Sequence, residues 1–187
     1  MASIATLVIF FFTLFLTFFI TIDGGFSSQS PIISTKRMAK MTRLHFYFHD
    51  IIDGKNPTAI QIIKSPNKTA AGIASFGTTF MADDPLTVGP EPTSKVVGRA
   101  QGLYALASQN EVGLLMVMNF AFSEGIYNGS SLSMLGRNPV FHTIREMPIV
   151  GGSGVFRFAR GYALAKTVWF NKNGDAVVQY NVTVVHY

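Results

Sequence analysis

Alternation of apolar and polar residues at every second position is the feature that most constrains the fold of this 187-residue chain. Near its start, Leu44, Phe46, Phe48 and Asp50 share one face of a predicted strand, and the residues between them share the other. No window repeats apolar residues at the three- and four-residue spacing of a helix, and glycines are spread throughout. The pattern therefore predicts an all-β chain.

Short strands joined by turns are typical of a β-sandwich or a β-barrel. Alternation with aromatic residues inside favours a closed up-and-down barrel, whose mouth can take a small ligand. Asn173-Gly174-Asp175 predicts a tight hairpin, Gly151–Gly154 predicts another turn, and Pro148 is expected to break the strand before it. The predicted strands span 44–51, 58–64, 72–81, 96–107, 112–122, 132–135, 140–146, 155–162 and 176–187.

The N-terminus carries an apolar run, 4–22, which is followed by small residues that suit signal-peptide cleavage. We assign 1–25 to a secretory signal peptide, 26–41 to a flexible arm and 42–187 to a β-barrel domain. The run is long and no basic residue precedes it, so an uncleaved signal anchor is the alternative. A cleaved signal predicts a secreted protein of the apoplast and cell wall.

The net charge of +5 suits adhesion to acidic cell-wall polysaccharide. Nucleic acid is not an expected partner, because the basic residues are scattered and no motif for base or phosphate recognition occurs. The chain has no cysteine, so cysteine usage says nothing about its compartment. Three sequons, at Asn67, Asn128 and Asn181, are candidate glycosylation sites.

Six stretches of the chain resemble plant dirigent proteins, and they occur in the family's order. They are FYFHDI at 46–51, NPTA at 56–59, DDPLTVGPEPTSKVVGRAQGLY at 83–104, YNGSSL at 127–132, LGRNPV at 135–140 and REMPIVGGSGVFRFARGYA at 145–163. The resemblance implies a secreted, glycosylated, eight-stranded antiparallel β-barrel that forms a homo-oligomer, a trimer or a dimer, and needs no cofactor.

Dirigent proteins bind phenoxy radicals of monolignols, which a laccase or a peroxidase generates, and steer their coupling toward one stereoisomer. The resemblance therefore implies a stereodirecting protein of lignan or phenylpropanoid biosynthesis that oxidises nothing itself. Some relatives act instead on quinone methides, as in the cyclisation and dehydration that form pterocarpans. A quinone-methide cyclase or dehydratase is thus one alternative, and a non-catalytic cell-wall component that patterns lignin is the other.

Such chemistry needs a shaped apolar cavity with a few polar groups. Asp50 is the first candidate catalytic residue, because it continues the inward row of Phe48, and an apolar wall would raise the pKa of its carboxyl. Its alternative is a turn residue at the strand end. Tyr104, on the small-residue face of its strand, and Phe48 are candidate substrate contacts, although a buried structural tyrosine is equally consistent with the pattern.

Arg145 matches an arginine that family members place in the cavity, where it would orient a phenolic oxygen; the alternative is a surface pair with Glu146. Asp84 is carried by the DDPL motif, but an Asp before Pro is often only a turn residue. Asn138 is a further candidate contact, at a position where the lignan-forming subgroup often has an aspartate. No metal site is expected, because His45 and His49 lie four strand residues apart, about 13 Å.

Overall fold

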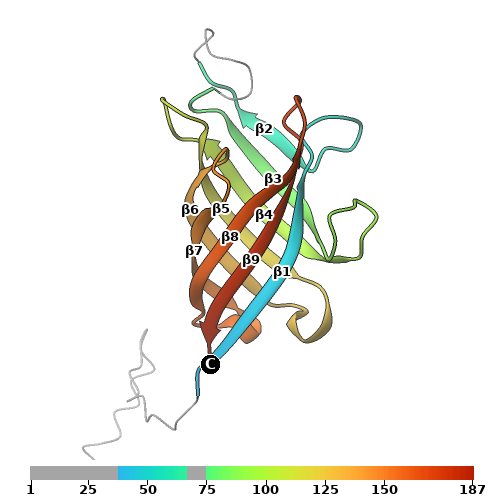
Figure 1. The fold of residues 1–187 in the computed structure, drawn as a ribbon, viewed down its shortest axis with the longest axis vertical. Helices are drawn as coiled ribbons and strands as arrows, with labels where there is room; N and C mark the ends of the chain where they lie inside the picture. Colours follow the sequence, from blue (N-terminus) through green and yellow to red (C-terminus); the bar gives the residue numbers. More distant parts are fainter. Residues whose placement is uncertain (1–37, 67–74) are drawn as a thin grey trace, which may run out of the picture. The chain divides into compact units, whose positions relative to one another are not determined.

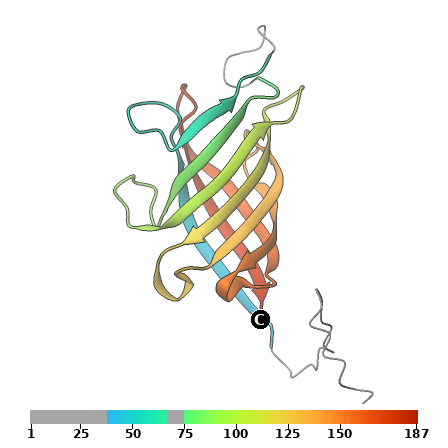
Figure 2. The same cartoon turned by 180° about the vertical axis from the view of Figure 1, so that it is seen from behind.

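The structure is a computed structural model that describes residues 38–66 and 75–187. The predicted signal peptide, most of the predicted arm and the Asn67 sequon lie outside the described residues. The described chain forms one antiparallel sheet that curls into a barrel, as Figures 1 and 2 show from opposite sides. Within these residues, no helix is long and apolar enough to cross a membrane.

Nine strands make up the described sheet, in the spatial order β1-β9-β8-β7-β6-β5-β4-β3-β2, and β1 also pairs with β3. Eight strands therefore close on themselves, and β2 extends the sheet beyond β3 outside the closed ring. This confirms the predicted eight-stranded antiparallel barrel. The strands are β1 Lys40–Asp50, β2 Ala59–Ile63, β3 Thr79–Thr87, β4 Val96–Leu106, β5 Gly113–Phe122, β6 Ser131–Pro139, β7 Arg145–Ser153, β8 Arg160–Phe170 and β9 Ala176–His186.

Closure of the barrel is uneven on the two sides of β1. The strand pairs with β9 over its whole length, from Lys40 opposite His186 to Asp50 opposite Ala176. Its pairing with β3 is short and consists of Tyr47 opposite Thr87 and the next residue pair. Beyond this short seam, the segment that leads into β2 bridges the two strands through hydrogen bonds of the Thr58 backbone to Ile51 (2.7 Å) and Asp83 (2.9 Å).

Inward-facing aromatic rings fill the end of the barrel at which the chain ends. Phe46 stacks on Tyr180 with ring centroids 5.7 Å apart and meets Phe120 edge-on at 5.0 Å. A short 3₁₀ helix, η3 (Gly154–Phe156), covers this end and buries Phe156, which stacks on Tyr127 of the 3₁₀ helix η2 (Gly125–Tyr127). Offset-stacked and edge-to-face arrangements are the favourable geometries for aromatic pairs, so these contacts stabilise the core at this end. The opposite end, where the hairpin turns β4–β5, β6–β7 and β8–β9 lie, is left for a cavity.

Small residues on the inner face of β4 serve close strand approach. A Cβ atom on Gly98 or Gly102 would collide with the backbone of β5, at Ala121 and Val117 respectively. Close approach of the neighbouring backbone therefore explains these two glycines, whereas the bend and the ligand contact that the sequence left open stay predictions. The same face places Tyr104 inward, with only 5% of its surface exposed.

Several predicted boundaries are wrong. The strand expected at 72–81 lies later, so that Asp83–Leu86 belongs to β3 and Asp84 is a strand residue, not the turn residue that was its alternative; residues 72–74 lie outside the described part. The expected strand at 140–146 is mostly the β6–β7 turn, and Pro148 lies inside β7. β1 starts at Lys40, within the predicted arm.

The largest error concerns the segment after Pro148. Gly151, Gly152 and Ser153 extend β7, and only Gly154 of the predicted turn has a positive φ, of 61°. The strand expected at 155–162 is replaced by η3 and by Phe158, which has a φ of 64° and is 73% exposed, so β8 begins only at Arg160. The hairpin expected at Asn173-Gly174-Asp175 is confirmed.

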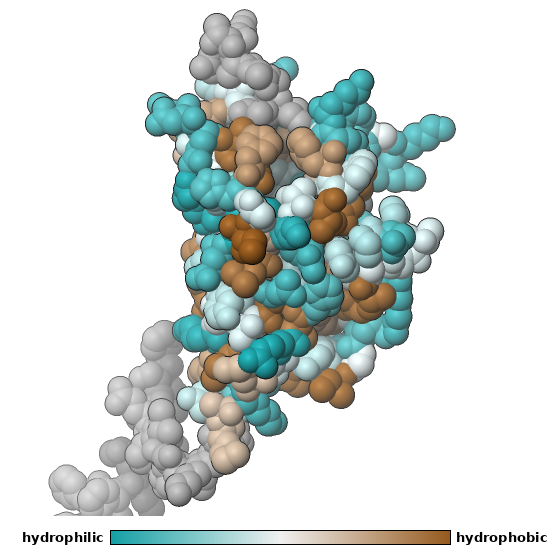
Figure 3. Space-filling model, viewed as in Figure 1, coloured by the Kyte–Doolittle hydropathy of each residue, from teal (hydrophilic) through white to brown (hydrophobic). Residues whose placement is uncertain are grey.

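The outer face of the barrel mixes polar and apolar side chains, as Figure 3 shows for the side over β8, β9 and β1. Tyr162 and Trp169 on β8 and Val185 on β9 are among its exposed apolar residues, with 40–49% of their surface accessible. On the opposite side, Met81, Val117 and Leu135 are cross-strand neighbours in one row with Leu103 and are 39–45% exposed.

Candidate functional site

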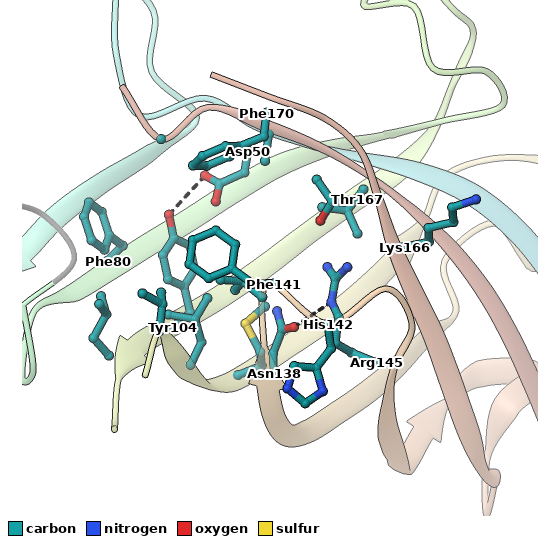
Figure 4. Close-up of a pocket in the computed structure, with 18 of the residues that line it drawn as sticks. Asp50, Phe80, Tyr104, Asn138, Phe141, His142, Arg145, Lys166, Thr167 and Phe170 are labelled. Atoms are coloured by element: carbon teal, nitrogen blue, oxygen red, sulfur yellow. Dashed lines mark hydrogen bonds between the residues drawn. The ribbon is translucent and has the colours of Figure 1, made fainter. Parts of the chain in front are cut away.

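A cavity of about 550 Å³ occupies the end of the barrel opposite the aromatic core. Its volume lies within the range of about 300–1,000 Å³ that is common for small-molecule sites. The walls are mainly apolar, and two hydrogen-bonded polar pairs line them, Asp50 with Tyr104 and Asn138 with Arg145 (Figure 4). The apolar lining residues are Ile52, Phe80, Leu106, Val112, Leu114, Met116, Val140, Phe141, Phe170, Ala176 and Val178.

Asp50 is the last residue of β1, and the alternation of that strand turns its side chain toward the cavity. The Tyr104 hydroxyl donates a hydrogen bond of 3.1 Å to its Oδ1. The pKa of Asp50 is raised to about 7, mainly by burial; the Tyr104 hydrogen bond acts in the opposite direction, and the charge of Asp175 adds to the rise. Near neutral pH, a large fraction of Asp50 therefore carries a proton that it can give to a ligand.

Asp84 lies behind Asp50 and is completely buried. Continuing the β1–β3 register from the pair Phe48 and Leu86 places the two carboxyl groups opposite each other. Neither oxygen of Asp84 has a hydrogen-bond partner among the described residues; the hydroxyl of Thr58 helps to lower its pKa, but donates its own hydrogen bond to the His49 carbonyl at 3.2 Å.

Burial, followed by repulsion from Asp50, raises the pKa of Asp84 to about 8. Because two close carboxylates resist ionising together, the pair behaves as a unit that holds at least one proton at neutral pH. The burial of Tyr104 raises the pKa of its own phenol far above the usual range, so Tyr104 remains a neutral hydrogen-bond donor.

Arg145, at the start of β7, is only 3% exposed and faces the cavity from another wall. Its Nε donates a hydrogen bond of 3.0 Å to Oδ1 of Asn138 at the end of β6. Nη1 has no partner, and none of the ion pairs between described residues involves this guanidinium. Burial lowers the pKa of Arg145, yet arginine keeps its charge in proteins. The cavity therefore holds a cation with unused donor capacity, which suits a phenolate or carbonyl oxygen.

Most of the sequence-derived candidates meet at this cavity. Asp50, Tyr104, Asn138 and Arg145 line it, and Asp84 supports it from behind. Phe48 does not line it, because its ring packs against Tyr180 in the core at 5.9 Å. Arg145 is buried and does not form the surface pair with Glu146 that was the alternative.

The sequence missed the residues that the turns bring to the mouth. Phe141 and His142 come from the β6–β7 turn, Lys166 and Thr167 from β8, and Lys172 from the β8–β9 turn. Only barrel closure brings these segments together, so no local signal marks them. Figure 4 shows Phe141 and His142 beside the Asn138–Arg145 pair.

The other candidates lie away from the cavity. His49 is buried against the Thr87 hydroxyl at 2.7 Å, whereas His45 is exposed and contacts Asn181 at 2.9 Å. Within the described ranges, 38–66 and 75–187, no cluster of three or more His, Asp or Glu side chains is arranged to hold a metal ion. Asn128 and Asn181 are both exposed, which is compatible with glycosylation, and their glycosylation stays a prediction.

Comparison with known proteins agrees with this geometry. The model of the family "Dirigent-like protein" matches residues 41–185. Dirigent protein 21 of Arabidopsis thaliana is 56% identical over 148 residues, covering 79% of this chain and 78% of that protein. Pterocarpan synthase 1 of Glycyrrhiza echinata is 53% identical over 165 residues, covering 87% of each chain.

Among solved structures, the pterocarpan synthase dirigent protein GePTS1 superposes with a TM-score of 0.77 at 51% identity, over 86% of this chain and 89% of that one. Sequence, fold and family model thus agree over nearly the whole barrel. The chain belongs to the dirigent protein family.

Proposed function

We propose that this protein is an acid-assisted cyclase or dehydratase of a phenolic alcohol, working through a quinone methide. The observation that carries the proposal is the carboxyl of Asp50, whose pKa burial raises to about 7, inside an apolar cavity whose other wall holds Arg145, a cation with no carboxylate partner among the described residues. The pterocarpan synthases among its relatives, at 52–53% identity, favour an isoflavonoid alcohol as the substrate class.

The reaction begins with the phenol directed at Arg145 and the alcohol directed at Asp50. Asp50 donates its proton to the hydroxyl, the C–O bond breaks and water leaves, while electrons from the phenol ring fill the vacancy and give a quinone methide. In this step the phenolic oxygen releases its own proton to solvent, and the guanidinium of Arg145 stabilises the negative charge that develops on that oxygen.

Ring closure follows from the same arrangement. A second hydroxyl of the substrate attacks the electrophilic carbon, a C–O bond forms, and the carboxylate of Asp50 takes the proton that is released. The electrons return to the phenolic oxygen, which takes a proton back from solvent. The net change is loss of one water, so no oxidant is required. Asp84 shares its proton with Asp50 and keeps the pair ready for both steps.

Stereodirected coupling of phenoxy radicals is the second candidate, supported by the flat apolar surfaces of the cavity. Phe80 stacks on Tyr104 with centroids 5.1 Å apart, and both line the wall on which a planar ring would rest. A cavity that holds two rings in one relative orientation would impose stereoselectivity without any acid. A laccase or peroxidase would supply the radicals.

One experiment separates the two candidates. The purified protein is incubated either with an isoflavonoid alcohol and no oxidant, or with coniferyl alcohol and laccase, and the products are resolved on a chiral column. We expect dehydration in the first reaction, and we expect Asp50→Asn to abolish it. Asp83→Asn is the matched control, because Asp83 is the neighbour of Asp84 on the outer face of β3. Racemic coupling in the second reaction together with dehydration in the first supports the cyclase; the reverse result rejects it.

We further propose that the protein is secreted and self-associates. The apolar segment at 4–22 and the exposed sequons at Asn128 and Asn181 support secretion, and the row around Val117 on the outer face supports self-association. Detection of N-glycans on protein from plant cell-wall extracts, and of an oligomer by light scattering, would test these two statements.

A further inference from the structure

Asp175 lies in the β8–β9 turn, one residue before β9, and does not itself line the cavity. We propose that Asp175 is a positioning residue of the site: its carboxylate ties the end of β1, which carries Asp50, to the turn that forms one side of the cavity mouth. The inference rests on the proposed function for its catalytic meaning, but the positioning itself can be measured without any turnover.

The contacts of Asp175 span the two segments. Its Oδ1 accepts hydrogen bonds from the backbone N–H groups of Ile52, at 2.9 Å, and Asp53, at 3.1 Å. These are the second and third residues after Asp50, just beyond the last β1–β9 residue pair. The carboxylate thus takes over where the strand ladder ends, and holds a segment that would otherwise be free to move at the mouth.

The turn that carries Asp175 is itself rigidly built. Oδ2 of Asp175 accepts a hydrogen bond of 2.9 Å from the Asn171 side-chain amide. Oδ1 of Asn171 accepts from the backbone N–H groups of Asn173 (2.9 Å) and Asp175 (3.0 Å), and the amide of Asn173 donates to Asp53 at 2.6 Å. Two side-chain links therefore join this turn to the end of β1.

Both segments contribute to the cavity wall. Ile52 lines it from the β1 side, and Phe170, Lys172 and Gly174 line it from the turn. A change at Asp175 is therefore expected to affect both the cavity mouth and the position of Asp50. The Asp175 carboxylate itself does not line the cavity, and its hydrogen bonds among the described residues do not include the Asp50 carboxyl.

The charge of Asp175 adds an electrostatic effect to this geometry. Its repulsion raises the pKa of Asp50, after the larger effect of burial. The other groups around Asp50 are Tyr104 from β4, Asp84 from β3 and Tyr180 from β9, and the cations that line the same cavity are Arg145, Lys166 and Lys172. Removing the Asp175 charge lowers the pKa of Asp50, so that Asp50 loses its proton at a lower pH.

The electrostatic arm of the test uses Asp175→Asn, whose amide oxygen can still accept from the Ile52 and Asp53 backbones. The carboxyl carbon of Asp50 is followed by NMR from pH 4 to pH 10 in protein labelled at aspartate, with Asp50→Asn identifying the signal. We expect the midpoint to move to lower pH in Asp175→Asn. Glu146→Gln removes the same charge from the outer face of β7 and is expected to leave the midpoint in place. Equal midpoints in Asp175→Asn and Glu146→Gln would overturn the electrostatic part of the proposal.

The geometric arm uses Asp175→Ala, which removes the acceptor. We expect amide hydrogen exchange of Ile52 and Asp53 to quicken at least tenfold relative to wild type, while Asp175→Asn retains protection. Unchanged exchange in Asp175→Ala would overturn the positioning role. If wild-type protein shows no turnover of any phenolic alcohol, the proposed function fails; the NMR and exchange results still decide the role of Asp175.

Discussion

Replacing Asp84 by asparagine removes a buried acid that resists ionisation, and we expect the substitution to stabilise the protein increasingly as the pH rises. In the unfolded chain the carboxyl has a pKa of 3.8, and in the folded barrel about 8. Below pH 3.8 both states are protonated and the residue costs nothing through ionisation. Between the two values only the unfolded state ionises, so wild-type stability falls by about 1.4 kcal/mol for each pH unit.

The full effect at pH 8 has an upper bound of about 5 kcal/mol, because Asp50 shares the proton and takes part of the cost. Urea unfolding of wild type and Asp84→Asn at each unit from pH 4 to pH 8 measures it. The difference in the free energy of unfolding is expected to grow steadily with pH, and its slope is more informative than its absolute value. A difference that stays constant over this range would show that Asp84 ionises normally in the fold, and the carboxyl pair would lose its physical basis.

Three further substitutions test the site and the barrel. Tyr104→Phe removes the hydrogen bond that favours ionised Asp50, so the pKa of Asp50 rises and the high-pH limb of the kcat/KM profile is expected to move to higher pH; an unmoved limb would contradict the assignment. Arg145→Met is expected to lower kcat/KM about 100-fold while circular dichroism stays unchanged, since it removes the donor to the phenolic oxygen. Gly161→Ala is expected to destabilise the barrel by about 2 kcal/mol or more, because its Cβ would collide with the backbone of β9; Gly151→Ala, whose Cβ meets only one arginine atom at 3.9 Å, should differ little from wild type in thermal unfolding.

Much of the fold was predictable because β-strand alternation is a local signal. The inward row of β1 could be followed residue by residue to Asp50, and the small inner face of β4 led to Tyr104. The segment after Pro148 failed for an equally physical reason. Its alternating aromatic residues suggested a strand, but Phe156 is buried by a 3₁₀ turn and Phe158 takes a left-handed backbone conformation, which alternation does not encode.

Asp84 shows where local reasoning stops. An Asp before Pro is common in turns, and nothing nearby in the chain distinguishes it from one. Only the closure of the barrel, with Tyr47 opposite Thr87, brings Asp84 to the same place as Asp50. The link from Asp175 to the end of β1 depends on contacts about 120 residues apart in the same way, so no sequence window contains both partners.

The two polar groups of the cavity are matched to the movement of one proton. At pH 7 the carboxyl pair supplies a neutral acid, while Arg145 supplies a fixed cation that needs no proton of its own. In the proposed reaction, Asp50 protonates the hydroxyl that leaves as water, while the phenol of the same substrate, held at Arg145, supplies the electrons. The substrate therefore uses both groups in one step. Radical coupling uses neither the proton nor the raised pKa of Asp50. Burying two carboxyls side by side is costly, and the proposed chemistry, in which one of them gives up a proton and takes one back, gives that cost a use.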